Sequence, residues 1–173
     1  MLKDNDCLRT PQYILDALGE FNLDPCAGVN TRLAKNNYAI ERGEDGLQME
    51  WVDTVWCNPP FSEKELWIEK MISHGNGILL LPERGSAPWF GPLANSCGNY
   101  FVSGEKINFL GGPSSNNLGS CFFPFGERAV SKIINSGLSG HFVIVERFTS
   151  RLSATSDKRT GAVEHTNTNK RSI

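Results

Sequence analysis

Residues 55–61 read VWCNPPF, an apolar strand sequence that runs directly into asparagine, two prolines and an aromatic residue. Consecutive prolines fix φ near about −65° and donate no backbone hydrogen bond, so they neither continue a central strand nor lie inside a helix. The chain must therefore leave the strand as a rigid, extended corner. This corner offers two acceptors, the side-chain oxygen of Asn58 and the carbonyl oxygen of Pro59, beside the ring of Phe61. It predicts a binding site for a flat molecule that carries an amino group.

The corner suits an exocyclic amine of a nucleobase that is about to be alkylated. The lone pair of such a nitrogen is delocalised into the ring, which makes the amine a poor nucleophile. Two acceptors on its hydrogens pull it toward tetrahedral geometry and stabilise the charge that develops on attack. A base must leave the duplex stack to reach such a site, and aromatic side chains hold flipped bases by stacking. The candidate catalytic residues are Asn58, Pro59, Pro60 and Phe61.

The sequence around the corner predicts a parallel strand–helix–strand unit. Residues 52–57 form an apolar strand, and Ser62 and Glu65 have the spacing of a capping box at a helix start. An apolar stripe continues the helix to Gly75, and residues 78–81 read ILLL, which is typical of a strand covered on both faces. Two strands joined by a helix pair in parallel through a right-handed crossover. An α/β fold is therefore expected.

Other elements flank this unit. Thr10 and Pro11 have the pattern of a helix start, a capping hydroxyl followed by proline, and this helix should end near Gly19. Residues 29–50 read as a loop with at most short strands. Strands are predicted at 21–23, 100–102, 107–110, 120–123 and 142–145, helices at 86–94 and 129–134, and a turn-rich loop at 111–119.

Size and composition indicate one domain of ordinary globular character. The chain has 173 residues, 39% of them hydrophobic and 21% charged. One domain is expected over residues 1–148, followed by a polar tail at 149–173 that is expected to be disordered. The tail segment 151–173 holds five Lys/Arg and two Asp/Glu. Residues 1–150 hold twelve Lys/Arg and seventeen Asp/Glu, so a basic tail follows a mildly acidic body. Such a protein should bind nucleic acid modestly and in a salt-sensitive way.

The sequence indicates neither a membrane span nor a disulfide or metal framework. No apolar run approaches the roughly 20 residues that cross a bilayer, and the N-terminus has no apolar signal core. The five cysteines are odd in number and lack metal-ligand spacing. We therefore expect reduced thiols, no metal and a cytoplasmic location.

The corner belongs to an ordered series of motifs. Upstream and downstream of it lie LDPCA at 23–27, DGL at 45–47, Trp51, LLLP at 79–82, Ser86 with Trp89 and Phe90, and INFLGG at 107–112. Its Asn-Pro-Pro-Phe sequence resembles the Asn/Asp-Pro-Pro-Tyr/Phe signature of amino-directed methyltransferases that use S-adenosylmethionine. The whole series, over about residues 8–147, resembles the phage-type DNA N6-adenine methyltransferase family.

This resemblance implies a fold, a cofactor and a partner. The fold would be a Rossmann-like methyltransferase sheet, mainly parallel and abbreviated on its N-terminal side. The cofactor would be S-adenosyl-L-methionine, and the partner DNA in a bacterial host cell, with the gene carried by a phage or prophage. The cofactor-binding residues would be Asp24, Pro25, Cys26, Ala27, Asp45 and Leu47. Asn58 lies 34 positions after Asp24, which leaves little room for the two further strands that a full methyltransferase sheet contains.

Several alternatives stay open at this point. Cys26 follows a proline, as the nucleophile of cytosine-C5 methyltransferases does, but no Lys or Arg lies within five residues to lower the thiol pKa. The same corner could act on cytosine N4, an RNA base or protein glutamine. A nucleic-acid-binding module with a vestigial cofactor pocket is a further alternative. Glu83 and Arg84 could touch substrate or form an exposed pair, and the sequence leaves the DNA recognition sequence and oligomeric state open.

Overall fold

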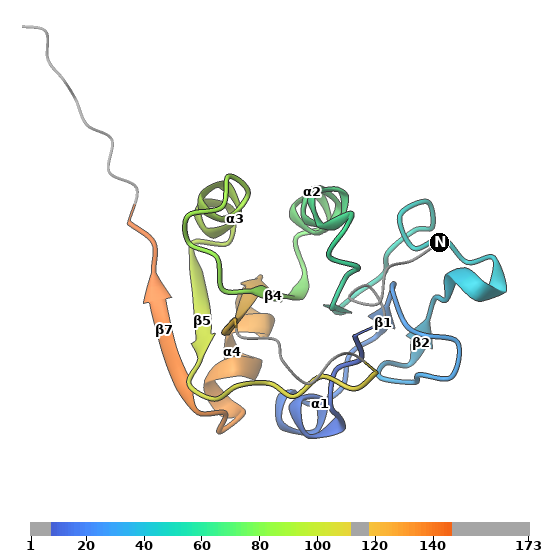
Figure 1. Ribbon diagram of the computed structural model, residues 1–173, viewed down its shortest axis with the longest axis horizontal. Helices are drawn as coiled ribbons and strands as arrows, with labels where there is room; N and C mark the ends of the chain where they lie inside the picture. Colours follow the sequence, from blue (N-terminus) through green and yellow to red (C-terminus); the bar gives the residue numbers. More distant parts are fainter. Residues whose placement is uncertain (1–7, 112–117, 147–173) are drawn as a thin grey trace, which may run out of the picture.

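The computed structural model describes residues 8–111 and 118–146, which form a seven-stranded sheet with helices on both faces (Figure 1). The helices are α1 (Gln12–Leu18), α2 (Lys64–His74), α3 (Phe90–Cys97) and α4 (Glu127–Asn135), with a short 3-10 helix, η2, at Ile40–Arg42. Helices α2 and α3 cover one face of the sheet, and α1 and α4 cover the other. In the described ranges, no helix is long and apolar enough to cross a membrane.

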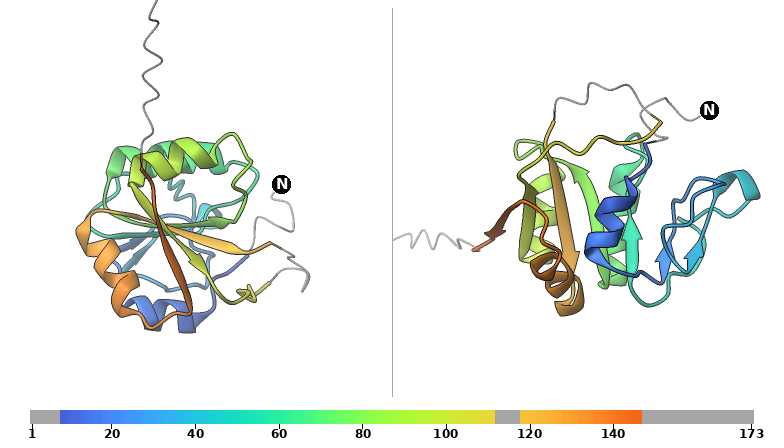
Figure 2. Two further views of the ribbon diagram at one scale, coloured as in Figure 1. Left: turned by 90° about the vertical axis from the view of Figure 1, so that its left-hand side faces the viewer. Right: turned by 90° about the horizontal axis from the view of Figure 1, so that it is seen from below.

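The sheet has the strand order β2-β1-β3-β4-β6-β5-β7. The strands are β1 (Leu23–Asp24), β2 (Asn36–Asn37), β3 (Val55–Cys57), β4 (Gly77–Pro82), β5 (Asn99–Ser103), β6 (Ser120–Phe125) and β7 (Gly140–Ile144). Between β1 and β3 the chain forms only β2 and η2. Figure 2 shows this segment at one end of the molecule and β7 at the other.

The sheet is mixed, and the expectation of a mainly parallel sheet is wrong. Strands β2, β1, β3 and β4 pair in parallel, whereas β4–β6, β6–β5 and β5–β7 pair antiparallel. The antiparallel pairs arise because α3 carries the chain past the position next to β4, and β6 later fills that position in the reverse direction. Two reversals leave β5 running the same way as β4.

Side chains of the central strands point alternately to the two faces of the sheet and so contribute to two apolar cores, one on each face. Val55 and Cys57 of β3 pack with α2 and α3, whereas Trp56 between them packs with α1 and α4. Strands β4 and β6 alternate in the same way, and each of their residues is buried. Strands covered on both faces need a continuous apolar sequence, which is why residues 78–81 are ILLL.

Most of the predicted elements are present, and the β3–α2–β4 unit is confirmed. Helix α2 ends at Gly75, whose left-handed φ of 72° explains why a glycine stands there. The start of the helix differs from the predicted capping box, because Glu63 and not Ser62 is the N-cap, the Glu63 side chain makes no cap hydrogen bond, and Glu65 forms an ion pair with Lys64 at 3.0 Å. The helix predicted at 86–94 begins later, at Phe90.

Two further predictions are wrong, namely the Thr10 cap at the start of α1 and the strand at 107–110. Helix α1 ends at Gly19 as expected, but Pro11 is its N-cap, and no side chain caps it. The segment 107–110 is not a strand, since it contributes one isolated bridge between Leu110 and Arg9. The tail at 149–173 and most of the loop at 111–119 lie outside the described residues.

Candidate functional site

A cavity of about 670 Å³, which we call the edge cavity, lies at the carboxyl ends of β1 and β3. Its walls come from the turn after β1, from η2 and the turn that follows it, from the corner after β3, and from the N-terminal segment. Ligands of open α/β sheets bind outside the carboxyl ends of the strands, and cavities of about 300–1,000 Å³ hold small molecules and cofactors. The lining residues are Leu8, Arg9, Pro25, Cys26, Ala27, Gly28, Val29, Asn30, Thr31, Ile40, Glu41, Glu44, Asp45, Gly46, Leu47, Asn58, Pro60, Glu63, Trp67 and Gly111.

The turn after β1 is held by a buried carboxyl group. Asp24 is 3% exposed, and its Oδ1 accepts a hydrogen bond from the Cys26 backbone N–H at 3.1 Å. Burial raises the pKa of Asp24 to about 7. Pro25, Cys26 and Ala27 line the edge cavity, but Asp24 lies behind them. Asp24 therefore shapes the turn and does not form part of the cavity wall.

Two thiols join this turn to the corner after β3. The Sγ atoms of Cys26 and Cys57 lie 3.7 Å apart, and the backbone N–H of Asn58 is near enough to Cys26 to lower the pKa of its thiol in part. Burial raises the pKa of the Cys26 thiol well above its usual value, and it raises the pKa of Cys57 as well. Cys26 is thus held as a neutral thiol, which disfavours the reading of Cys26 as a nucleophile.

The turn after η2 brings Asp45 and Leu47 into the same cavity. The Leu47 backbone N–H donates to Asp45 Oδ1 at 2.9 Å, which leaves the second carboxylate oxygen of Asp45 for other partners. Lys70 of α2 fixes the turn from outside, because its Nζ donates to the carbonyls of Leu47 at 2.8 Å and Met49 at 2.7 Å. The predicted cofactor residues from two distant segments therefore meet in one cavity.

Close backbone contact between these two segments depends on Gly46. A Cβ atom at this position would overlap the carbonyl oxygen of Pro25 and would crowd the Trp67 ring. The carbonyl of Gly46 accepts a hydrogen bond from Trp51 Nε1 at 2.8 Å. The glycine of the DGL motif thus permits the contact, and the tryptophan that follows the motif secures it.

The corner after β3 presents the amide of Asn58 to the cavity. Asn58 Nδ2 donates to the carbonyl of Leu8 at 2.9 Å and to Thr10 Oγ1 at 3.3 Å. Its Oδ1 accepts no hydrogen bond from the described residues. Among the described residues, the protein thus fixes the amide nitrogen, and the amide oxygen stays able to accept from a ligand.

The other corner residues differ in exposure. Pro60 lines the edge cavity, Pro59 is buried, and Phe61 is half-buried and packs against the core beneath α2 and α3. The carbonyl of Phe61 accepts from Lys64 Nζ at 3.2 Å. Among the four predicted catalytic residues, the cavity wall contains Asn58 and Pro60.

The ionisable groups of the edge cavity are mainly acidic. The wall contains one basic residue and four acidic residues, which are Arg9, Glu41, Glu44, Asp45 and Glu63. Such a wall attracts a cationic ligand and repels phosphate. Part of the acidic charge is paired, since Glu44 accepts from Arg42 at 2.6 Å and this ion pair lowers the pKa of Glu44.

Sequence reasoning did not identify several residues of this site. Leu8, Arg9 and Trp67 line the cavity without belonging to a functional motif, and they are placed there by the packing of α2 and the N-terminal segment. Lys70 likewise carries no motif and holds the turn after η2 from outside the cavity. The glycine of DGL was a usable signal, because a glycine between two functional residues often marks a close backbone approach. Glu83 and Arg84 do not line the edge cavity.

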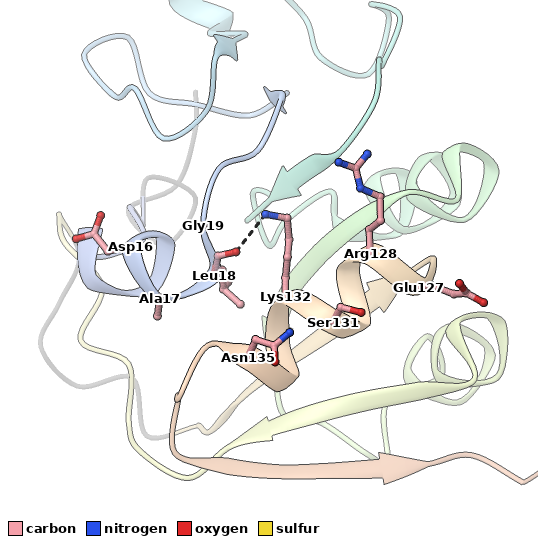
Figure 3. A pocket seen from close by; sticks show the side chains of 9 residues that line it. All are labelled: Asp16, Ala17, Leu18, Gly19, Glu127, Arg128, Ser131, Lys132 and Asn135. Carbon is pink, nitrogen blue, oxygen red and sulfur yellow. Dashed lines mark hydrogen bonds between the residues drawn. The ribbon is translucent and has the colours of Figure 1, made fainter.

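A second depression, of about 550 Å³, lies between α1 and α4 and is called the α1–α4 hollow (Figure 3). Its lining residues are Asp16, Ala17, Leu18, Gly19, Glu127, Arg128, Ser131, Lys132 and Asn135. Lys132 points to the end of α1, where its Nζ donates to the carbonyls of Leu18 at 3.1 Å and Glu20 at 2.7 Å. In the described part of the chain, no group of three His, Cys, Asp or Glu residues could hold a metal ion.

Comparison with known proteins agrees with the family that the motifs resemble. The chain is similar to the DNA N-6-adenine-methyltransferase of Escherichia phage T1, with 26% identity over 148 residues. This alignment covers 68% of the chain and 61% of the phage T1 protein, so the chain spans less than two thirds of that relative. No solved structure matches the chain. Residues 2–125 match the DNA N-6-adenine-methyltransferase (Dam) family. The chain therefore belongs to the DNA N-6-adenine-methyltransferase (Dam) family.

Proposed function

We propose that this protein methylates adenine N6 at specific sites in DNA, with S-adenosylmethionine as methyl donor. The observation that carries the proposal is the Asn58 amide at the wall of the edge cavity, whose nitrogen is bound by the protein and whose oxygen accepts no hydrogen bond from the described residues. Membership of the Dam family supports it independently. The likeness to the phage T1 protein supports DNA as the partner and the cytoplasm of a bacterial host as the location.

The edge cavity fits S-adenosylmethionine in size and charge. The cofactor carries a sulfonium, an ammonium and a carboxylate group, so its net charge is positive and suits the acidic wall. Thr31 lines the cavity, and its buried Oγ1 has no hydrogen-bond partner among the described residues, so it can bind a polar group of a ligand. Pro25, Cys26 and Ala27 would hold the methionine part, while Asp45 and Leu47 would bind the adenine part.

The bound cofactor supplies an electrophilic methyl group. Asn58 Oδ1 and the Pro59 carbonyl would accept hydrogen bonds from the target amine and favour attack by its lone pair. Phe61 would stack on the flipped base, and Pro60 would keep the corner rigid. Catalysis would then rest on positioning and on fixed dipoles and would need no covalent intermediate.

The direction of the strands is compatible with a Rossmann-like methyltransferase sheet. Strands β1 to β5 run in one direction, and the edge cavity lies at the carboxyl ends of β1 and β3. Ligands bind at this edge in doubly wound folds. The short connection between β1 and β3 would make this an abbreviated version of that sheet.

Methyl transfer from labelled S-adenosylmethionine to duplex DNA tests the proposal. We expect label in DNA as N6-methyladenine, and methylation-sensitive sequencing of host DNA after expression should locate the sites. Parallel reactions with RNA and with glutamine-containing peptides test the other amino substrates, and analysis of the labelled base separates adenine N6 from cytosine N4. Titration calorimetry with the cofactor tests the vestigial-pocket alternative, which requires that no saturable heat is observed.

A further inference from the structure

The side-chain amide of Asn58 is oriented by two acceptors from a distant part of the chain. Its Nδ2 lies 2.9 Å from the Leu8 carbonyl oxygen and 3.3 Å from Thr10 Oγ1. A carbonyl oxygen can only accept hydrogen bonds, so the nitrogen of the amide must face Leu8. An amide turned by 180° would place two oxygens against each other, which leaves both without a donor.

The segment that supplies these acceptors is itself fixed. Arg9 and Leu110 exchange two backbone hydrogen bonds of 2.9 Å each, one in each direction. Thr10 is 3% exposed, although threonine is a polar residue and stands outside any helix or strand. A buried hydroxyl needs a partner, and the Asn58 amide provides one. Burial of Thr10 is thus explained by Asn58 and not by a helix cap, since α1 has none.

The backbone that carries Asn58 is also in contact with the turn after β1. Cys57, the residue before Asn58, places its Sγ 3.7 Å from Cys26 Sγ of that turn. The corner thereby packs against the predicted cofactor segment, and the Asn58 side chain is hydrogen-bonded to the Leu8–Thr10 segment. The amide plane is defined by these contacts before any substrate arrives, which is the condition for electrostatic preorganisation.

We propose that Thr10 is a positioning residue, which together with the Leu8 carbonyl holds the Asn58 amide so that Oδ1 meets the amine of the substrate. The proposal rests on the proposed function, because it assigns a task to the residue that orients Asn58. Thr10 acts through Asn58 and has no contact with substrate of its own. Its removal should therefore reduce the rate of methyl transfer and leave the affinity for cofactor and DNA unchanged.

The variants Thr10→Val and Thr10→Ser test this assignment. Valine keeps the shape of threonine and lacks the acceptor, whereas serine keeps the hydroxyl. Loss of one neutral hydrogen bond predicts that Thr10→Val lowers kcat roughly 3- to 10-fold, with KM values unchanged, and that Thr10→Ser stays within about 2-fold of the native rate. Thermal unfolding reports whether each variant is folded. If Thr10→Val does not fold, Thr10→Ala is measured in its place.

A double-mutant cycle with Asn58→Ala separates positioning from a structural role. If Thr10 acts through Asn58, then Thr10→Val has no further effect on single-turnover rates when Asn58 is already alanine. Equal losses from Thr10→Val in both backgrounds, or a change in KM alone, would overturn the positioning role. A native rate in Asn58→Ala would instead overturn the proposed function. A large loss in Asn58→Ala without any loss in Thr10→Val would overturn the inference about Thr10 only.

Discussion

The edge cavity and the α1–α4 hollow are similar in size, at about 670 and 550 Å³, but they differ in the polar groups that they leave for a ligand. In the edge cavity, Asn58 uses its amide nitrogen within the protein, and its oxygen accepts from none of the residues that the structure describes. In the hollow, Lys132 binds the carbonyls of Leu18 and Glu20 and lies 4.6 Å from the centre of the Phe21 ring. Size therefore does not identify a ligand site, whereas an acceptor that the protein holds in a fixed orientation, such as Asn58 Oδ1, indicates one.

The two regions also differ in how they are built. The edge cavity stands on β1 and β3, which are two and three residues long, and its walls are turns tied together by side-chain hydrogen bonds. The hollow lies between two helices that cover one core of the sheet. Changes at the edge cavity should therefore affect catalysis or ligand binding, and changes at the hollow should affect stability alone.

Asn58→Ala should produce the largest effect on activity. It removes one preorganised acceptor of the target amine, and the loss of a single such group costs about 10²–10³ in kcat. Cofactor affinity should stay near the native value, because the predicted cofactor contacts lie on the turns after β1 and η2. Methylation rates and calorimetric cofactor titration measure the two quantities.

A matched control comes from the hollow. Asn135→Ala removes the same amide group from the lining of the α1–α4 hollow, and its methylation rate should equal the native rate. Comparable losses in Asn58→Ala and Asn135→Ala would contradict the distinction between the two regions.

The buried carboxyl of Asp24 should make stability fall as pH rises. Its folded pKa of about 7 lies above its usual value of 3.8, because burial disfavours the charged form. Between these two values the folded state keeps a proton that the unfolded state has lost, so the free energy of unfolding falls as pH rises through this window and levels off above it. The difference between the two pKa values corresponds to a loss of at most about 4 kcal/mol in the free energy of unfolding.

Asp24→Asn tests this pH dependence. Asparagine keeps an oxygen for the Cys26 backbone N–H and has no charge to bury. The variant should match the native protein near pH 4 and should be more stable than it at pH 8. Urea unfolding across this pH range measures the stability of both proteins. If Asp24→Asn kept the native slope of stability against pH, another group would be responsible for the pH dependence.

Gly46→Ala should weaken the edge cavity by separating its two predicted cofactor segments. The new Cβ would overlap the Pro25 carbonyl, which is backbone and cannot move aside as a flexible side chain can. Overpacking of this kind typically costs about 1–3 kcal/mol, and we expect reduced cofactor affinity as well. Unfolding curves and cofactor titrations report the two effects.

Gly85→Ala is the control for that substitution. Gly85 lies in an exposed turn before α3, its φ is not positive, and a Cβ there would meet no atom within 4 Å. The control should therefore be as stable as the native protein or more so, with native cofactor affinity. A native cofactor affinity in Gly46→Ala would mean that the Pro25 contact does not shape the pocket.

The parts of the fold and site that sequence predicts are those set by local constraints. Two prolines force a corner wherever they occur, so the position of Asn58 after β3 follows from the sequence. An apolar stripe ending at Gly75 and the continuous apolar run at 78–81 define α2 and β4 in the same local way. Pro25 to Ala27 and Asn58 lie at one cavity because the carboxyl ends of the parallel strands β1 and β3 share an edge, whereas the turn after η2 brings in Asp45 and Leu47.

Nonlocal choices account for the failures. The Thr10 hydroxyl could cap its own helix or bind a residue 48 positions away, and local sequence does not distinguish the two. The insertion of β6 between β4 and β5 is equally a property of the whole chain, which is why the sheet was expected to be mainly parallel. The depth of Asp24 behind the cavity wall depends on packing that no motif encodes.

Lys132→Met should have the smallest effect in this set, and it tests the assignment of the hollow as structural. Methionine keeps an apolar stem over Phe21 but loses the hydrogen bonds to the Leu18 and Glu20 carbonyls at the end of α1. We expect a loss of about 1 kcal/mol in the free energy of unfolding and an unchanged methylation rate. Lys35→Met removes the same charge from an exposed ion pair with Glu20, at 3.3 Å, and should cost less. If Lys132→Met instead lowered methylation at native stability, the hollow would have a functional role and the contrast between the two regions would fail.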